Sequence, residues 1–126
     1  MTGMQKKYSL GKDERVCRRG DIERLFSDGL RASDGVLSVI AMPAVAARAR
    51  LGVGVSKRWG GAPHRNRLKR LLREAFRQSK NDIPPLDYFL MPRLGVEKMT
   101  LDAAMESLKK LAGRLGERVD RGKNGR

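Results

Sequence analysis

The chain has 126 residues, enough for one domain with a modest core, and 28 Lys and Arg against 14 Asp and Glu give it a formal charge of +14. Apolar residues at 40% and aromatic residues at 5% exclude disorder throughout and predict an aliphatic core. A single cysteine and a single histidine exclude an internal disulfide and a Cys/His zinc site. No apolar run is long enough for a membrane span or a signal peptide, so we expect a cytoplasmic protein with no membrane partner.

The first half of the chain predicts one helix and two strands. Residues 1–12 lack hydrophobic periodicity, and we expect them to form a flexible basic arm. Apolar residues recur at helical spacing over residues 21–28 and predict a short first helix. Two β-branched runs, at residues 36–42 and 51–57, predict strands joined by a loop, and a further short strand is expected to follow them before the next helix.

The second half predicts a helix, a strand and a last helix. The long helix is expected over residues 63–79, because proline is favoured in a first turn, and the proline-containing segment 81–85 ends it. Residues 87–91 predict another strand. Thr100 is a good N-cap for the last helix, whose apolar spacing is lost from residue 116 onward.

This order of elements indicates the α+β class. We expect a single-domain, two-layer sandwich of helices around one small sheet, because each amphipathic element must bury its apolar side against another layer. The domain is expected to occupy residues 13–115. It lies between the flexible arm and a ragged C-terminal tail that is expected over residues 116–126.

The excess positive charge is concentrated in one segment. Residues 57–80 hold nine basic groups and one acid, a net +8 of the total +14. On a helix, the apolar side chains of this segment form one stripe, and the adjoining stripe is almost wholly cationic: Arg65, Asn66, Lys69, Arg70, Arg73, Arg77 and Lys80. Like charges at i and i+4 repel, so the stripe favours a nucleic-acid partner whose phosphates neutralise it. We expect Glu74 to be structural and to pair with Arg70 or Gln78.

Three residues or faces near this stripe have more than one interpretation. Trp59, in the turn before the long helix, either stacks on a base or plugs the turn against the core. The glycine face of the second strand, with Gly52 and Gly54, admits the close approach of a packed helix or, less readily, of RNA. His64 abuts the cationic stripe, and we expect it to make a polar contact rather than to bind a metal.

Residues 55–77, VSKRWGGAPHRNRLKRLLREAFR, resemble the signature of the bacterial ribonuclease P protein subunit. In that family a strand ending in V-S-K-K/R is followed by a glycine turn and by R-N-R-x-K-R-x-x-R-E-x-F-R on a helix. The matching positions are Ser56, Lys57, Arg58, Gly60, Ala62, Arg65, Asn66, Arg67, Lys69, Arg70, Arg73, Glu74, Ala75 and Phe76. The resemblance extends weakly over nearly the whole chain.

The resemblance implies both a fold and a function. The fold has the order αβββαβα around a small mixed sheet, with a left-handed crossover through the central helix, against the usual right-handed rule. In the function it implies, a catalytic RNA subunit removes the 5′ leader of precursor tRNA endonucleolytically, using Mg²⁺ bound mainly by that RNA. The protein binds the catalytic RNA and the leader, and we expect one protein per RNA.

Carried over by position, the resemblance implies two groups of site residues. The residues expected to face the catalytic RNA are Lys57, Arg58, Arg65, Asn66, Arg67, Lys69, Arg70 and Arg73, and Arg77 continues the same row. The residues expected to line a cleft for the single-stranded leader are Ile22, Phe26, Ser38 and Ile40. The family often has aromatic residues at the place of Ile22 and near Ile40. Stacking is worth roughly 1–3 kcal/mol per base, so we expect weaker stacking on the leader here.

Three rival functions are weighed against this one. A nuclease acting alone needs clustered carboxylates to hold metal, but the acids here are scattered, so we expect no catalytic residue and no metal site on the protein. A general RNA-binding or ribosomal-type protein without a cleavage role would share this composition, and the R-N-R signature argues against it. A DNA-binding helix is disfavoured because Asn66 is almost its only base-reading residue.

Overall fold

The computed structural model describes residues 19–44 and 49–124, so the predicted arm over residues 1–12 lies outside the described residues. The helices and strands, in chain order, are α2 (Arg19–Asp28), β1 (Leu30–Ser33), β2 (Leu37–Pro43), β3 (Arg50–Val53), α3 (Ala62–Ser79), β4 (Leu86–Pro92) and α4 (Leu101–Asn124). Two short 3-10 turns, η2 (Lys57–Trp59) and η3 (Lys80–Asp82), flank α3. The predicted α+β class and the order αβββαβα are confirmed.

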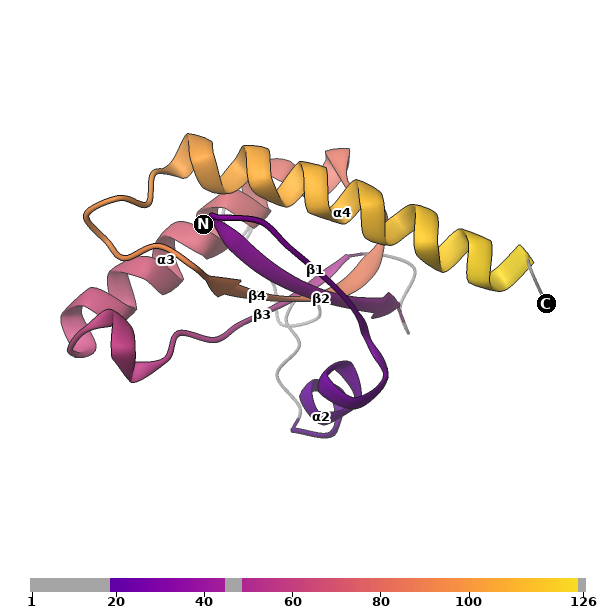
Figure 1. Cartoon of the computed structure of the whole chain (residues 1–126), viewed down its shortest axis with the longest axis horizontal. Coiled ribbons are helices and arrows are strands. Elements are labelled where there is room, and N and C mark those ends of the chain that lie inside the picture. The colour runs from indigo at the N-terminus through magenta and orange to yellow at the C-terminus, as the bar shows by residue number, and fades with distance from the viewer. Residues whose placement is uncertain (1–18, 45–48, 125–126) are drawn as a thin grey trace, which may run out of the picture.

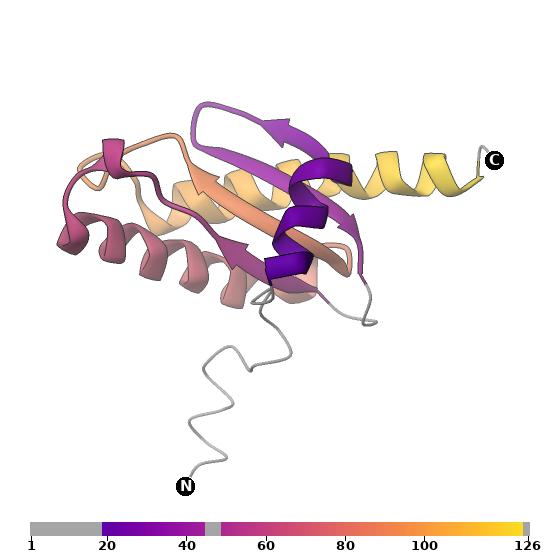
Figure 2. The ribbon, with the colours of Figure 1, turned by 90° about the horizontal axis from the view of Figure 1, so that it is seen from below.

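The four strands form one mixed sheet in the order β1-β2-β4-β3 (Figure 1). Strands β1 and β4 each pair antiparallel with β2, whereas β3 runs parallel to β4. The parallel pair is joined through α3, as the resemblance implies, and the left hand of this crossover stays a prediction. Helices α3 and α4 cover one face of the sheet, and α2 crosses the opposite face (Figure 2).

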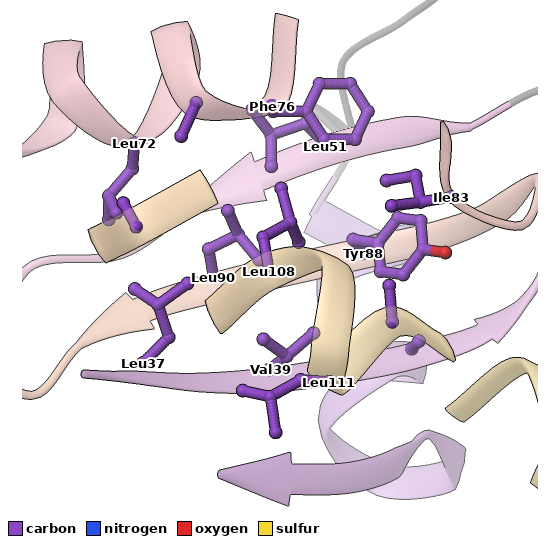
Figure 3. Close-up of a cluster of buried hydrophobic side chains, with 14 of the residues drawn as sticks. Leu37, Val39, Leu51, Leu72, Phe76, Ile83, Tyr88, Leu90, Leu108 and Leu111 are labelled. Carbon is purple, nitrogen blue, oxygen red and sulfur yellow. The ribbon is translucent and has the colours of Figure 1, made fainter. Parts of the chain in front are cut away.

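The main core lies between the sheet and helices α3 and α4 (Figure 3). Strand alternation sends Val39 of β2 and both Tyr88 and Leu90 of β4 to this side, where they pack in one cluster with residues of α3 and α4. The predicted apolar stripe of α3 is buried through four fully enclosed residues, Leu68, Leu72, Ala75 and Phe76. The Tyr88 hydroxyl donates to the carbonyl oxygen of Pro84 at 2.6 Å, and burial raises the pKa of Tyr88. Because this stripe is buried, the neighbouring cationic stripe faces outward.

Two strands differ from their sequence-based expectations. The additional short strand, β1, precedes the two β-branched runs instead of following them. Its four residues alternate between half-buried and exposed, a pattern too short to show periodicity. Strand β3 ends at Val53 rather than at residue 57. The Gly54 N–H still donates to the Leu90 carbonyl at 3.0 Å, but the chain then turns, and Trp59 N–H bonds to Ser56 within the η2 turn.

The last helix begins as predicted and ends later. The Ala103 N–H donates to Thr100 Oγ1 at 3.1 Å, which confirms Thr100 as the N-cap. The ragged tail predicted from residue 116 is wrong as far as Asn124, because α4 continues to that residue and projects past the sheet (Figure 1). Gly116 is buried against Pro84, and Arg118 donates to the Arg31 carbonyl at 2.8 Å. These tertiary contacts keep the segment helical after the apolar spacing is lost.

Candidate nucleic-acid interface

The cationic side of α3 is presented by a tight entry turn. Gly60 has φ of 119°, a backbone conformation that favours glycine, and Gly61 is the N-cap of α3. Arg65 Nε donates to the Gly60 carbonyl at 3.2 Å, which holds this first arginine of α3 against the turn. Of the predicted RNA-facing residues on η2 and α3, Lys57, Arg58, Asn66, Arg67, Arg70 and Arg73 are exposed, and Arg65 and Lys69 are partly exposed. The structure therefore brings the predicted RNA-facing residues together on one outward surface.

Most of these cations have no acidic neighbour. We define the cationic row as Lys57, Arg58, Arg65, Arg67, Lys69, Arg70 and Arg73. Within the described residues, the carboxylates that form ion pairs bind Arg24, Arg50, Arg77, Lys109 and Lys110, and none of them binds a member of the row. The charge of the row is therefore left for a partner to neutralise.

Arg77 differs from the rest of the predicted set. Its guanidinium donates to both oxygens of Glu74, with Nε at 2.9 Å from Oε1, and Gln78 Nε2 donates to Glu74 Oε2 at 2.5 Å. The hydrogen bonds from Arg77 and then from Gln78 lower the pKa of Glu74 to about 2. The expected pairing of Glu74 with Gln78 is confirmed, whereas its other predicted partner, Arg70, is replaced by Arg77. The unpaired row thus ends before the last turn of α3.

A groove of about 550 Å³ lies on the opposite face of the sheet, beside α2. We call it the aromatic groove; its walls include Phe26, Gly54, Val55, Trp59, Phe89 and Met91, with Arg58 and Arg93 at its end. Phe26 is 40% exposed, and its ring meets Phe89 edge to face with centroids 5.0 Å apart. A Cβ at Gly54 would lie 2.8 Å from Phe89 Cζ, so Gly54 receives an aromatic ring rather than the packed helix that we favoured, and the approach of RNA to this glycine stays a prediction.

The residues predicted to line the leader cleft are placed unevenly. Phe26 lines the aromatic groove, and Ile22 packs beside it on the small cluster of Leu25, Ile40 and Phe89. The expectation that Ile40 forms part of the lining is wrong, because Ile40 is fully buried beneath α2. Ser38 is half-buried and pairs in register with Met91 of β4, outside the groove lining.

The sequence analysis missed Phe89 and Met91 as groove residues. Both lie on β4, and the signal that could have found them is strand alternation. Tyr88 and Leu90 face the main core, so Phe89 and Met91 must face the other side, where Gly54 leaves room. The family often has aromatic residues at the place of Ile22 and near Ile40, where this chain has aliphatic ones. Phe89 supplies an aromatic ring to the groove from a different element.

A buried ion pair holds α2, one wall of this region, to the sheet. Arg50 donates to Asp87 through Nε at 2.8 Å and Nη2 at 2.7 Å, and these residues are neighbours in the register of the parallel strands. Arg50 Nη1 also lies 3.7 Å from Asp21 of α2. The side chains of Arg50 and Asp87 are only 15% and 5% exposed. The position of α2 over the sheet therefore depends on this charge network.

Trp59 lies where the groove meets the turn before α3. Its ring is partly buried against the main core, which supports its interpretation as a plug, and the Arg58 guanidinium lies 4.6 Å from the ring centroid. Base stacking by Trp59 stays a prediction. Over residues 19–44 and 49–124, no three His, Cys, Asp or Glu side chains gather as a metal site, and no helix in this part is long and apolar enough to cross a membrane.

An outward row of unpaired cations, with an aromatic groove on the same α+β fold, defines a nucleic-acid-binding protein. The sequence profile of the family described as Ribonuclease P matches residues 10–116. The ribonuclease P protein component of Pseudoalteromonas translucida is 32% identical over 116 residues, 91% of this chain and 83% of that one. That of Saccharophagus degradans is 33% identical over 95 residues, 74% and 70% of the two chains.

Solved structures agree with this assignment. The ribonuclease P protein of Thermotoga maritima superposes with a TM-score of 0.70 at 30% identity, covering 80% of this chain and 96% of that one. The Staphylococcus aureus protein gives a TM-score of 0.67 at 28% identity, covering 78% and 91%. The chain belongs to the ribonuclease P protein family. It is the protein part of the enzyme that processes the 5′ end of tRNA, and it has an RNA partner.

Proposed function

We propose that the protein binds the catalytic ribonuclease P RNA through the cationic row and holds the 5′ leader of precursor tRNA in the aromatic groove. The observation that carries this proposal is the row itself, seven clustered cations without a carboxylate partner among the described residues. Phosphates supply the missing countercharge, and arginine can grip them bidentately. Binding to phosphates also removes the repulsion between like charges along α3.

In this proposal the protein acts by positioning. Two RNAs repel each other through their backbones, and the row lowers that repulsion where the catalytic RNA and the substrate meet. The aromatic groove suits a single strand, because the exposed ring of Phe26 offers an apolar surface to an unpaired base. Arg58 and Arg93 at the end of the groove suit the phosphates that connect successive bases.

The proposal assigns the hydrolytic, endonucleolytic step to the catalytic RNA. Mg²⁺ would supply the electrostatic stabilisation of that step and is bound mainly by the RNA. The described residues of the protein offer no clustered ligand set, so we derive no step from a protein-bound metal. One protein per RNA, acting in the cytoplasm, completes the proposal.

Reconstitution tests the proposal directly. Purified protein is mixed with transcribed ribonuclease P RNA and a precursor tRNA at limiting Mg²⁺, and release of the 5′ leader is measured. We expect the protein to stimulate cleavage over RNA alone, Arg70→Ala/Arg73→Ala to abolish the stimulation, and Lys109→Ala on α4 to keep it. RNA binding without stimulation would instead support a general RNA-binding protein, and cleavage by the protein alone would establish a nuclease.

The groove has its own test. Phe26→Ala removes a ring that is 40% exposed and that packs on Phe89, so the fold of the variant is checked by circular dichroism. We expect it to weaken binding of precursor tRNA by roughly 1–3 kcal/mol, the value of one base stack, and to leave binding of mature tRNA unchanged. Equal effects on the precursor and on mature tRNA would show that the leader does not use this groove.

A further inference from the structure

A second cavity, of about 490 Å³, lies beyond Trp59. We call it the distal cavity. It is an open cavity bordered by η2, the first turn of α3 and the connection from β4 to α4, and Figures 1 and 2 show these segments at the same end of the molecule. The residues that line it, and do not line the aromatic groove, include His64, Leu94, Gly95, Glu97 and Lys98. The β4–α4 connection forms one wall of this cavity, so the distal cavity is a different surface from the cationic row.

The distal cavity and the aromatic groove share a boundary. Arg58, Trp59 and Arg93 line both of them, so a chain that leaves the groove at this boundary enters the distal cavity. The boundary lies at the carboxyl ends of β3 and β4, which are parallel neighbours and therefore end at the same edge of the sheet. In open α/β sheets, ligands bind outside the carboxyl ends of parallel strands, and the one parallel pair of this mixed sheet ends at this boundary.

The charge of the distal cavity favours an anion. Arg58, Arg93 and Lys98 oppose one acid, Glu97, and none of the three cations forms an ion pair with a carboxylate of the described chain. The first turn of α3, which borders the cavity, carries no acidic residue.

An aromatic surface lies beside these cations. Gly95 borders the Trp59 ring without a side chain, and a Cβ there would lie 3.6 Å from Trp59 Cε3. The indole therefore stays accessible from the distal cavity. A cationic wall next to an accessible indole matches the alternation of phosphate and base in a single nucleic-acid strand.

We propose that the distal cavity binds the continuation of the single RNA strand held in the aromatic groove, with Lys98 and Arg93 at a phosphate and Trp59 at the adjoining base. The inference rests on the proposed function, because it takes the groove as the site of a single strand. It adds a second binding position for the strand next to the groove. The affinity of the protein for a leader then depends on whether the leader is long enough to pass Trp59.

The single tryptophan of the chain gives a direct readout, because Trp59 forms the shared boundary. Full-length protein, without catalytic RNA, is titrated with single-stranded RNA oligonucleotides of graded length, and quenching of Trp59 fluorescence gives the affinity. The test variant is Lys98→Ala. The matched control is Lys109→Ala, which removes the same charge from an α4 side chain that is 45% exposed.

We expect wild-type protein and the control to gain affinity several-fold once the oligonucleotide is long enough to leave the groove. Lys98→Ala should lose this gain, keep the affinity for short oligonucleotides, and lower the log–log salt slope for long ones by about 0.7. Phe26→Ala should weaken binding at every length. Identical affinities of Lys98→Ala and Lys109→Ala at all oligonucleotide lengths would overturn the inference. It would also be overturned if Lys98→Ala weakened binding of the catalytic RNA and left binding of the oligonucleotides unchanged. Failure of reconstitution with the length effect intact would instead overturn the proposed function.

Discussion

Asp87 is the most deeply buried acid among the ion pairs of the described chain. Its carboxylate accepts two hydrogen bonds from Arg50, and Arg50 in turn approaches Asp21 of α2. Such a pair contributes little net stability when intact, because desolvation offsets the attraction. Loss of one partner is costly, since the other charge stays buried without a countercharge. The pair therefore fixes where α2 lies more than it stabilises the fold.

We expect Asp87→Ala to lower the free energy of unfolding by about 3–5 kcal/mol, because the buried Arg50 guanidinium loses both hydrogen bonds to its nearest carboxylate. Urea denaturation followed by circular dichroism measures this. Asp82→Ala is the matched control: its carboxylate is 61% exposed and 3.7 Å from Lys109, and loss of such a surface pair costs about 1 kcal/mol or less. Equal losses in the two variants would contradict the buried-pair account.

Asp34 connects the β1–β2 turn to α4. Its Oδ1 accepts hydrogen bonds from the N–H groups of Val36 at 2.8 Å and Leu37 at 2.9 Å. Its Oδ2 accepts one from the Ser107 hydroxyl at 2.8 Å and lies 3.0 Å from Lys110 Nζ. Burial raises the pKa of Asp34, but these hydrogen bonds together outweigh burial and hold the pKa well below its ordinary value of 3.8.

Because the folded state lowers the pKa of Asp34, its ionised carboxylate stabilises the fold at neutral pH. That contribution is fully present above the unfolded pKa and is lost as pH falls from about 4 toward the folded pKa. We expect Asp34→Asn to cost about 1–3 kcal/mol at pH 7 and progressively less below about pH 4. Urea midpoints of both proteins across this range provide the measurement, and a constant difference would show that ionisation of Asp34 is not involved.

At the scale of elements, α4 shows how a tertiary contact decides where a helix ends. Gly113 and Gly116 lie one turn apart in α4 and differ only in their surroundings. A Cβ at Gly113 meets nothing within 4 Å, whereas a Cβ at Gly116 would lie 2.6 Å from Pro84 Cγ. The glycine at 116 is therefore a packing residue, although in the sequence it looks like a helix stop.

The two glycines give opposite predictions for the same substitution. Gly113→Ala should raise the free energy of unfolding by up to about 1 kcal/mol, because alanine is the better helix former. Gly116→Ala should lower it, since the Pro84 ring must move to admit the methyl group. Thermal unfolding of both variants tests this, and stabilisation by both would show that α4 does not pack on Pro84.

The elements that could be predicted from sequence are those with a strong period or a clear cap. Helix α3 was found within one residue of its bounds because its apolar stripe, its proline and its glycine turn agree. Strand β1 is too short for such a signal, and the C-terminal part of α4 depends on Pro84, a partner that no local pattern reveals. Local patterns thus predict elements, and long-range contacts decide their ends.

The candidate site follows the same rule. The cationic row could be predicted because its members lie on one helix, where spacing alone places them together. Strand alternation places Phe89 on the groove side of β4, but its contact with Phe26 could not be predicted, because Phe26 lies on another element. The pairing of Arg77 with Glu74 is local but ambiguous, since an acid on a helix can reach cations on either side of it.

At the scale of the whole molecule, the formal charge of +14 matters less than its distribution. In the described part, the carboxylates in ion pairs lie on α2, in the β1–β2 turn, on α3 at Glu74, in η3 and on β4. The cationic row and the distal cavity have none. Positive charge without a paired carboxylate is therefore concentrated on η2 and α3, next to both cavities.

Three alanine variants distinguish the effect of net charge from the effect of where the charge lies. Each removes one positive charge, but from a different place on the surface. Arg73→Ala removes an exposed member of the row, Arg77→Ala a cation held by Glu74, and Lys109→Ala a cation near Asp82. In binding of ribonuclease P RNA, we expect Arg73→Ala to lower the log–log salt slope by roughly 0.7 to 0.9, Arg77→Ala by less, and Lys109→Ala not at all. Equal decreases in all three would mean that the RNA responds to net charge, and the row would then have no special place in the interface.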